Sequence, residues 1–232
     1  MRVRCPPAYA LPRLLPNARG VMWRTTEMTA VDDRPTTGNV DIEPTTSNMV
    51  KFFESLEVPE DFKVELLRGE IVMMAGPDLV HNRIVLRVLR QIPDQNWDCL
   101  QTQDIDLLCE TSEPQPDLVV LERDAGPESG RLLPAQLITM LVEVVSKNSV
   151  DRDYGVKRSI YAAGGIPAYL VVDPIMAQCV LFTEPVGSGE EADYRAQRIG
   201  KFGESVPLAL LDVDLDTSEF GTLPNVRPHR RP

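Results

Sequence analysis

The 232-residue sequence has few of the residues from which zinc sites and disulfide frameworks are built. It holds two histidines, His81 and His229, and four cysteines that are scattered without C-x-x-C spacing. This scarcity argues against a structural zinc site and is typical of reduced thiols in a cytoplasmic protein. No apolar run approaches the roughly 18 residues that a membrane span needs, so we expect no membrane segment.

Basic charge is also scarce. The sequence has 24 Lys and Arg against 35 Asp and Glu, a formal net charge of −11. Residues 1–50 contain six Arg and five acidic residues, so the rest of the chain carries −12. An acidic surface of this kind repels nucleic acid unless positive charge gathers on one face.

The two ends of the chain differ in composition from its middle. Residues 1–47 are rich in Pro, Arg, Thr and Asp and show no sustained hydrophobic periodicity. We predict a disordered N-terminal extension there, or an over-extended gene start with alternatives at Met22, Met28 or Met49. The hydrophobic content of 43% supports one core, so we predict a single domain over residues 48–223 and a disordered tail over residues 224–232.

The middle of the chain alternates between strand and helix patterns. The run FKVELLRGEIVMMAGP predicts a hairpin that turns at Arg68-Gly69. Apolar residues at helical spacing predict a helix from Asp78, its cap, to Ile92, and alternation predicts one strand over Asp98–Leu108. The apolar run DLVVLE predicts another strand, and Leu137–Pro174 reads as strand, loop, helix and strand.

Charged residues stand inside these apolar segments. Glu65, Asp117 and Glu143 lie in or at strands, where an unpaired buried carboxylate costs several kcal/mol. Lys157 lies on the following helix at the border of its apolar stripe, so its long stem can reach over the sheet. Mg²⁺ prefers carboxylate oxygens and keeps waters and substrate phosphate as further ligands. The pattern therefore predicts a phosphodiester-cleaving site, in which a metal ion activates water and the lysine stabilises developing charge.

Several pieces occur in a specific order: ELLRGEIVMM, a helix opened by His81, PQPDLVVLE, LVEVVS, D-x-x-x-K-x-x-x-Y and GIPAYLVVDP. This order resembles the Uma-type restriction endonuclease family of the PD-(D/E)XK nuclease superfamily, over Met49 to Leu223. The resemblance implies an α/β fold, a mixed twisted sheet of the restriction-endonuclease type with helices on both faces. It also suggests a homodimer.

The resemblance assigns roles to particular residues. It implies that Asp117 is the acid of the PD element, that Glu143 is the acid of the E-x-K element, and that Glu65 is an additional acid. The backbone carbonyl of Val144 would be the remaining protein ligand of the metal. One departure stands out, because Val145 occupies the lysine position of E-x-K. The family pattern places a lysine on the next helix instead, which Lys157 fills, with Lys147 in the loop as a second candidate.

Each of these residues also has an ordinary structural explanation. Asp117 and Glu143 can cap turns or form internal salt bridges, and Lys157 can pair with Asp153 in an exposed contact of about 0.3–0.5 kcal/mol. His81 can be a helix-terminal histidine packed on the core. The stripe Arg83, Arg87 and Arg90 can be a solvated helix face, and it is also our candidate phosphate contact.

The function we expect is that of a metal-dependent endodeoxyribonuclease, which hydrolyses DNA phosphodiester bonds with Mg²⁺ or, alternatively, Mn²⁺. Glu65, Asp117, Glu143 and Lys157 are its predicted catalytic residues. The acidic charge favours a second hypothesis, a non-catalytic binding or scaffold module that retains the nuclease fold. A two-carboxylate glycosidase is a third hypothesis, and it has no requirement for a lysine.

Overall fold

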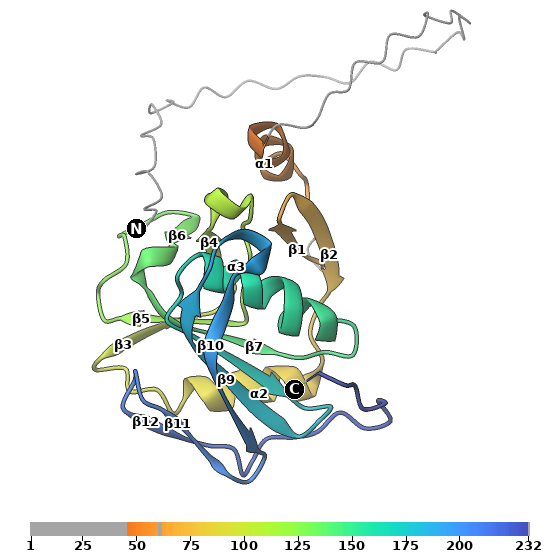
Figure 1. Ribbon diagram of the computed structural model, residues 1–232, viewed down its shortest axis with the longest axis vertical. Helices are drawn as coiled ribbons and strands as arrows, with labels where there is room; N and C mark the ends of the chain where they lie inside the picture. The colour runs from red at the N-terminus through yellow and green to blue at the C-terminus, as the bar shows by residue number, and fades with distance from the viewer. Residues whose placement is uncertain (1–45, 60–61, 232) are drawn as a thin grey trace, which may run out of the picture. The chain divides into compact units, whose positions relative to one another are not determined.

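A six-stranded mixed sheet forms the centre of the molecule (Figure 1). The computed structural model describes residues 46–59 and 62–231. Strands β7 and β8 run parallel, and every other neighbouring pair in this sheet is antiparallel. Across the sheet the strands are β10 (Asp193–Lys201), β9 (Gln178–Val186), β8 (Ala168–Asp173), β7 (Ile138–Val144), β5 (Leu118–Glu122) and β3 (Trp97–Leu100).

Helix α2 (Leu79–Leu89) covers one face of this sheet. The predicted cap is present, because the Asp78 side chain accepts a hydrogen bond from the His81 N–H. The apolar side chains Ile84, Val85 and Val88 are buried and pack on alternate residues of β5, β7 and β8. The helix predicted from this spacing is confirmed, although it ends at Leu89, about one turn before the predicted end at Ile92.

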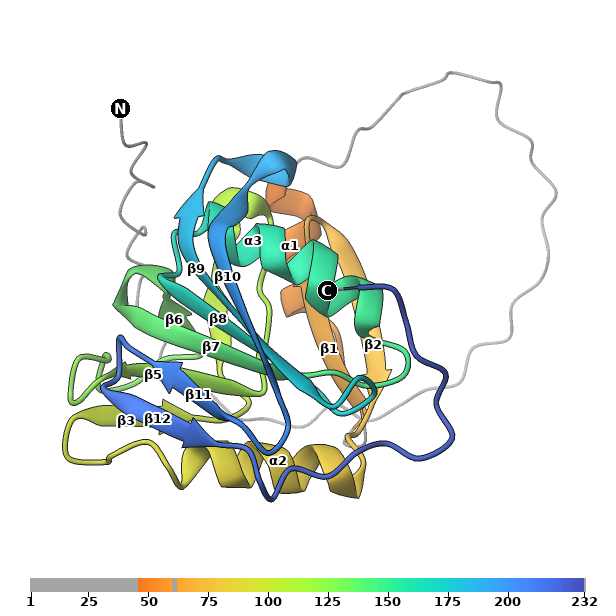
Figure 2. The same ribbon diagram turned by 60° about the horizontal axis from the view of Figure 1, so that its bottom comes forward.

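The opposite face is covered by the connection from β7 to β8 (Figure 2). This connection is a π-helical segment, η3 (Arg152–Lys157), that continues as helix α3 (Arg158–Ala163). Its residues Tyr154, Ile160 and Tyr161 are buried in a separate core cluster, distinct from the one that contains α2. The predicted α/β architecture with helices on both faces is therefore confirmed. No helix among the described residues is long and apolar enough to cross a membrane.

The predicted hairpin is also confirmed. Strands β1 (Phe62–Leu67) and β2 (Glu70–Ala75) pair antiparallel outside the main sheet, after the short helix α1 (Thr46–Glu54). Arg68 and Gly69 connect them with φ of 48° and 78°. Both values are positive, which matches the right-handed twist of a two-residue hairpin and favours glycine at one of the two positions.

The single strand predicted over Asp98–Leu108 is wrong. The chain instead forms β3 and then β4 (Asp104–Asp106), which pairs in parallel with β6 (Leu132–Pro134) in a separate sheet. Thr102 lies between them with φ of 54°, a left-handed conformation that ends an extended run. Four polar residues in a row, Gln101–Asp104, stand at this break and interrupt the alternation that suggested one strand.

The remaining elements are small. Strands β11 (Ser205–Leu208) and β12 (Val213–Asp216) form a two-stranded sheet that packs with α2 in the same core cluster. Single 3₁₀ turns occur at η1 (Leu108–Glu110), η2 (Ala135–Leu137) and η4 (Gly189–Glu191).

The predicted domain boundaries stay predictions. Residues 1–45 of the predicted N-terminal extension lie outside the described residues. In the predicted C-terminal tail, residues 224–231 form no helix or strand, yet His229 contacts the buried Asp173 at 2.8 Å.

Candidate metal centre

The three predicted acids come from three neighbouring segments. Glu65 lies in the middle of β1 and is fully buried, and Glu143 lies one residue before the end of β7 with 3% of its surface exposed. Asp117 directly precedes β5, the strand that pairs with β7. The start of β5 and the end of β7 meet at one edge of the sheet because these strands are antiparallel.

Asp117 is bonded to the backbone of β7. Its Oδ2 accepts a hydrogen bond from the Val144 N–H at 2.8 Å, and His81 Nε2 lies 2.8 Å from the same oxygen. Continuing the register of β5 and β7 by two residues places Pro116 opposite Val144. Proline has no N–H to donate, and the N–H and C=O of a strand residue point the same way. The Val144 carbonyl therefore points toward the side of Asp117. It receives no ladder hydrogen bond from Pro116, because proline has no N–H.

Lys157 joins the other two acids. Its Nζ lies 2.7 Å from Glu143 Oε1 and 2.8 Å from Glu65 Oε1, and the residue is 1% exposed. The exposed pairing of Lys157 with Asp153 is wrong, because Asp153 is itself buried and accepts a hydrogen bond from Ser149. Lys157 is thus a buried ammonium shared by two carboxylates.

Three further groups complete the contacts. The Tyr161 hydroxyl donates to Glu143 Oε1 at 2.7 Å. The Gln115 N–H donates to Glu65 Oε1 at 2.8 Å. Lys63 Nζ lies 3.6 Å from Glu65 Oε1 and 3.7 Å from Asp117 Oδ1. Sequence reasoning missed Lys63, although it precedes Glu65 by two residues and so shares its face of the strand.

The pKa values of these groups shift in different directions. Burial opposes the charge of Lys157, yet Glu143 and Glu65 raise its pKa above the ordinary value. Burial also works against ionisation of Glu65 and Asp117, but Lys157 beside Glu65, and His81 and Lys63 beside Asp117, hold both pKa values low. Burial raises the pKa of Glu143 to about 8, and the charge of Asp117 adds to this.

This arrangement leaves one carboxylate in excess. Two lysines, Lys63 and Lys157, balance two of the three acids, and His81 is charged only when protonated. The burial of Glu143 then favours its neutral form. An excess negative charge of this kind is balanced either by a proton on Glu143 or by an additional cation.

Comparison with known proteins identifies the family of the chain. A family model described as "Putative restriction endonuclease" (Uma2) matches residues 50–218. The chain belongs to the Uma2 family. No curated protein matches the chain.

A solved structure has the fold of this Uma2 protein. It is described as a "putative nuclease belonging to DUF820" from Anabaena variabilis ATCC 29413. The TM-score is 0.55 at 12% sequence identity, and the alignment covers 74% of this chain and 96% of the other. At this identity the likeness establishes the fold alone.

The site of this Uma2 protein fits a divalent cation with few protein ligands. Among residues 46–59 and 62–231, no three His, Cys, Asp or Glu side chains already surround one point. Mg²⁺ does not need three, because it is bound by one or two carboxylates and completes its shell with water and phosphate. Asp117, Glu143 and the Val144 carbonyl are oxygen donors of this kind, and their role as ligands stays a prediction. The buried Glu65 Oε2, which has no hydrogen-bond partner within the described part of the chain, is a further oxygen.

The other predicted contacts lie apart from these carboxylates. Arg83 and Arg90 are exposed on α2, and Arg87 forms an ion pair with Glu219 at 3.0 Å. Helix α2 reaches the site only through its first turn, where His81 touches Asp117. Lys147 is exposed in the loop after β7.

Proposed function

We propose that this Uma2 protein is a Mg²⁺-dependent endonuclease that hydrolyses DNA phosphodiester bonds. The observation that carries the proposal is the position of Asp117 beside Val144, next to Glu143, with the buried Lys157 ammonium 2.7 Å from Glu143. This is an arrangement of hard oxygen ligands with a fixed positive charge. It suits the chemistry of a phosphate group that becomes more negative during attack.

Asp117, Glu143 and the Val144 carbonyl would hold the metal ion. When bound, a divalent cation supplies polarisation of the phosphoryl group and a lowered pKa of water. Lys157 keeps its proton, because its pKa is raised by Glu143 and Glu65 despite burial. It therefore places a permanent positive charge beside the phosphate, and Glu65 holds the ammonium in position.

The substrate would approach from the side of Asp117 and Lys63. The side chains of these two residues are 13% and 24% exposed, whereas those of Glu65 and Glu143 are 0% and 4% exposed. Lys63 stands at this opening within 3.7 Å of both Asp117 and Glu65. We expect it to contact the incoming phosphate, since an exposed ammonium is a common phosphate partner.

The test is cleavage of plasmid and linear DNA with Mg²⁺ or Mn²⁺, together with titration calorimetry of the metal. We expect cleavage and binding heat for the wild type, and loss of both for Glu143→Ala. Glu122→Ala removes an exposed acid at the end of β5 of the same sheet and serves as the matched control. Metal binding without any cleavage would contradict the endonuclease.

The scaffold hypothesis keeps one specific observation in its favour. Residues 51–223 hold 30 acidic and 15 basic residues, a net charge of −15. Such a surface binds phosphates weakly. Calorimetry separates the two hypotheses, because a scaffold predicts no metal heat, or the same heat for wild type and Glu143→Ala.

The proposal includes a homodimer in the cytoplasm. Phe62 and Met73, which are 44% and 56% exposed, support self-association. By the register of β1 and β2, Phe62 pairs with Ala75 and Met73 with Val64, so these four residues share one face of the hairpin. Exposed apolar residues that gather on one face are typical of interaction surfaces.

A further inference from the structure

The C-terminal segment reverses the charge of the chain. Residues 224–232 contain Arg227, Arg230 and Arg231 and no acid, a net charge of +3 against −15 for residues 51–223. The family match ends at residue 218, so this segment is a feature of this chain beyond the matched region. We call residues 224–231 the basic arm.

A buried carboxylate anchors the basic arm. Asp173, at the end of β8, is fully buried, and its Oδ2 lies 2.8 Å from His229 Nε2 and accepts a hydrogen bond from the Tyr154 hydroxyl at 2.9 Å. The rings of His229 and Tyr154 also touch, with centroids 5.5 Å apart. His229 therefore fixes the middle of the arm on the protein.

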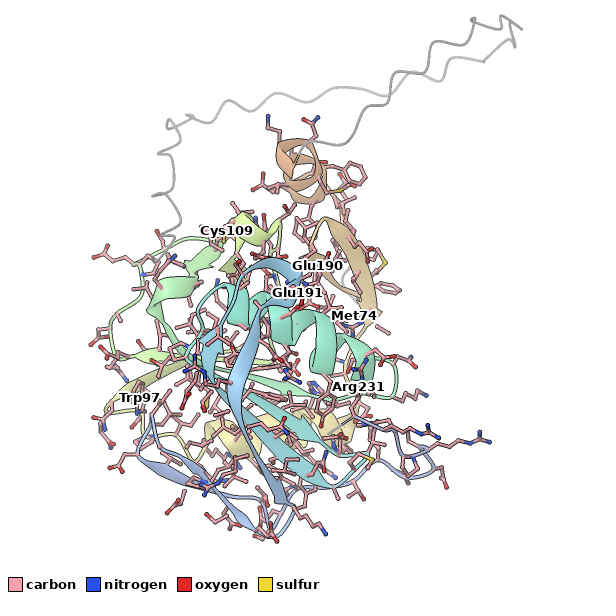
Figure 3. The ribbon with its side chains drawn as sticks, in the orientation of Figure 1. Met74, Trp97, Cys109, Glu190, Glu191 and Arg231 are labelled. Carbon is pink, nitrogen blue, oxygen red and sulfur yellow. The ribbon has the colours of Figure 1, made fainter. Side chains whose placement is uncertain are left out.

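The two ends of the arm are also held. Just before it, the Leu223 N–H donates to the Pro174 carbonyl at 2.9 Å. Near its other end, Arg231 Nη2 donates to Asp151 Oδ1 at 2.9 Å. Figures 2 and 3 show the segment running back to the start of η3, where Arg231 is labelled. The arm thus lies along the protein surface between β8 and η3.

The arm closes one side of a positively charged cavity of about 510 Å³. Lys147 lines it from the loop after β7, and Arg227, Arg230 and Arg231 line it from the arm. Asp151 is the one carboxylate among the lining residues, and Arg231 neutralises it. Arg227, Arg230 and Lys147 are exposed, so their charges face solvent.

The cavity lies at the same end of the sheet as the metal centre. Asp173 follows Val172, which pairs with Val144 across β7 and β8. Lys147 follows Glu143 by four residues, so their Cα atoms are at most roughly 14 Å apart. A strand of duplex DNA advances about 3.4 Å per nucleotide along the axis, so this span corresponds to at most roughly four nucleotides.

We propose that the basic arm and Lys147 bind the phosphates of a DNA strand next to the bond that is cut. The inference rests on the proposed endonuclease function and names its nucleic-acid contact. It places the phosphate contact on the arm rather than on Arg83, Arg87 and Arg90 of α2. It also supplies the local positive charge that an acidic protein needs to hold DNA.

The test is fluorescence anisotropy of a labelled DNA duplex in EDTA, where cleavage cannot interfere. For Arg227→Ala/Arg230→Ala at about 0.1 M salt we expect affinity to fall on the order of tenfold or more, and the slope of log K against log salt to decrease by about two. Arg195→Ala/Arg198→Ala removes the same charge from exposed positions of β10 and should change neither quantity.

His229→Ala provides an independent variant, because it releases the anchor and keeps every arginine. We expect it to weaken DNA binding while the far-ultraviolet circular dichroism stays that of the wild type. Equal weakening by the arm variant and by the β10 control would overturn the proposal, since it would reflect net charge alone. Unchanged binding of both arm variants would also overturn it.

Cleavage assays test the proposed endonuclease activity separately from DNA binding by the arm. If Arg227→Ala/Arg230→Ala cleaves DNA at the wild-type kcat/KM, the proposed role of the arm is contradicted and the proposed endonuclease activity is supported. If the wild type cleaves no DNA with Mg²⁺ or Mn²⁺ but its DNA binding depends on the arm, the endonuclease proposal is contradicted. The arm then stands as a nucleic-acid contact.

Discussion

Glu143 differs from Glu65 and Asp117 in the direction of its pKa shift, because its pKa is raised and theirs are lowered. Burial raises its pKa to about 8 from an ordinary value of 4.5, and Asp117 contributes further. Between these two values the folded protein holds a proton that the unfolded chain has lost. The free energy of unfolding therefore falls as pH rises, because the folded state binds more protons.

We predict that wild-type stability decreases between about pH 5 and pH 9 and that Glu143→Gln decreases less over the same range. Glutamine keeps the shape and still accepts hydrogen bonds from Lys157 and Tyr161, but it has no proton to lose. Urea unfolding at several pH values measures the difference, with Glu122→Gln as the control. Parallel curves for wild type and Glu143→Gln would contradict the raised pKa.

If a metal ion binds at Glu143, the same proton has to leave. Carboxylates coordinate in the ionised form, so we predict that metal binding below about pH 8 releases a proton and that affinity increases with pH up to that point. Calorimetry with Mn²⁺ in two buffers of different ionisation enthalpy measures the release. Equal heats in the two buffers would show that Glu143 is already ionised.

Lys157 is expected to hold the site together as well as to act in it. Lys157→Met keeps most of the side-chain volume but leaves Glu65 and Glu143 without their shared partner. Breaking a buried ion pair in this way costs about 3–5 kcal/mol, so we predict a loss of stability of this size. Adding Glu65→Gln removes the negative charge that has lost its partner and should recover part of the loss. Chemical denaturation measures both variants, and a loss near zero for Lys157→Met would contradict the buried pair.

At the scale of elements, the first turn of α2 connects helix packing to the site. The Asp78 side chain caps the N–H of His81, whose ring contacts Asp117. We predict that Asp78→Ala lowers the free energy of unfolding by about 1 kcal/mol, as is usual for a lost cap. Thermal and urea unfolding test this. Arg83→Ala, an exposed change on the same helix, should have a much smaller effect.

The elements that the sequence predicts best are those with a strong local pattern. The hairpin at Arg68-Gly69 and helix α2 follow from turn chemistry and helical spacing, so they need no knowledge of distant partners. The end of β3 was missed because the apolar residues on either side were joined into one strand across the polar run Gln101–Asp104. The π-helical turns of η3 were missed because their apolar pattern also suits an α-helix.

The site was predictable to a similar degree. The order of Asp117, Glu143 and Lys157 in the sequence pointed to one centre, and the structure brings Lys157 to Glu143. Which acid Lys157 would contact, and the contact of His81 with Asp117, depend on strand pairing and helix position. The anchor of His229 on Asp173 joins residues 56 positions apart, and no local pattern announces it.

At the scale of the whole molecule, charge is divided along the chain. The −15 of residues 51–223 favours solubility and disfavours contact with polyanions, whereas Arg227, Arg230 and Arg231 gather around one cavity. If the basic arm binds DNA, the acidic surface of residues 51–223 disfavours DNA contacts at other places on the protein. Local placement of charge thus matters more for this protein than its total.

The proposed homodimer is tested at the scale of the whole molecule. The face of the hairpin that carries Phe62 and Met73 is exposed and apolar, and a two-fold dimer presents the same patch from both subunits. We predict that light scattering during size-exclusion chromatography gives twice the chain mass for wild type. Phe62→Asp/Met73→Asp should give the mass of one chain, because a buried unpaired carboxylate at the contact costs several kcal/mol. The double change Arg195→Asp/Arg198→Asp on exposed β10 is the control and should remain dimeric. A wild type with the mass of one chain at every concentration would contradict the homodimer, and a dimeric Phe62→Asp/Met73→Asp would place the interface elsewhere.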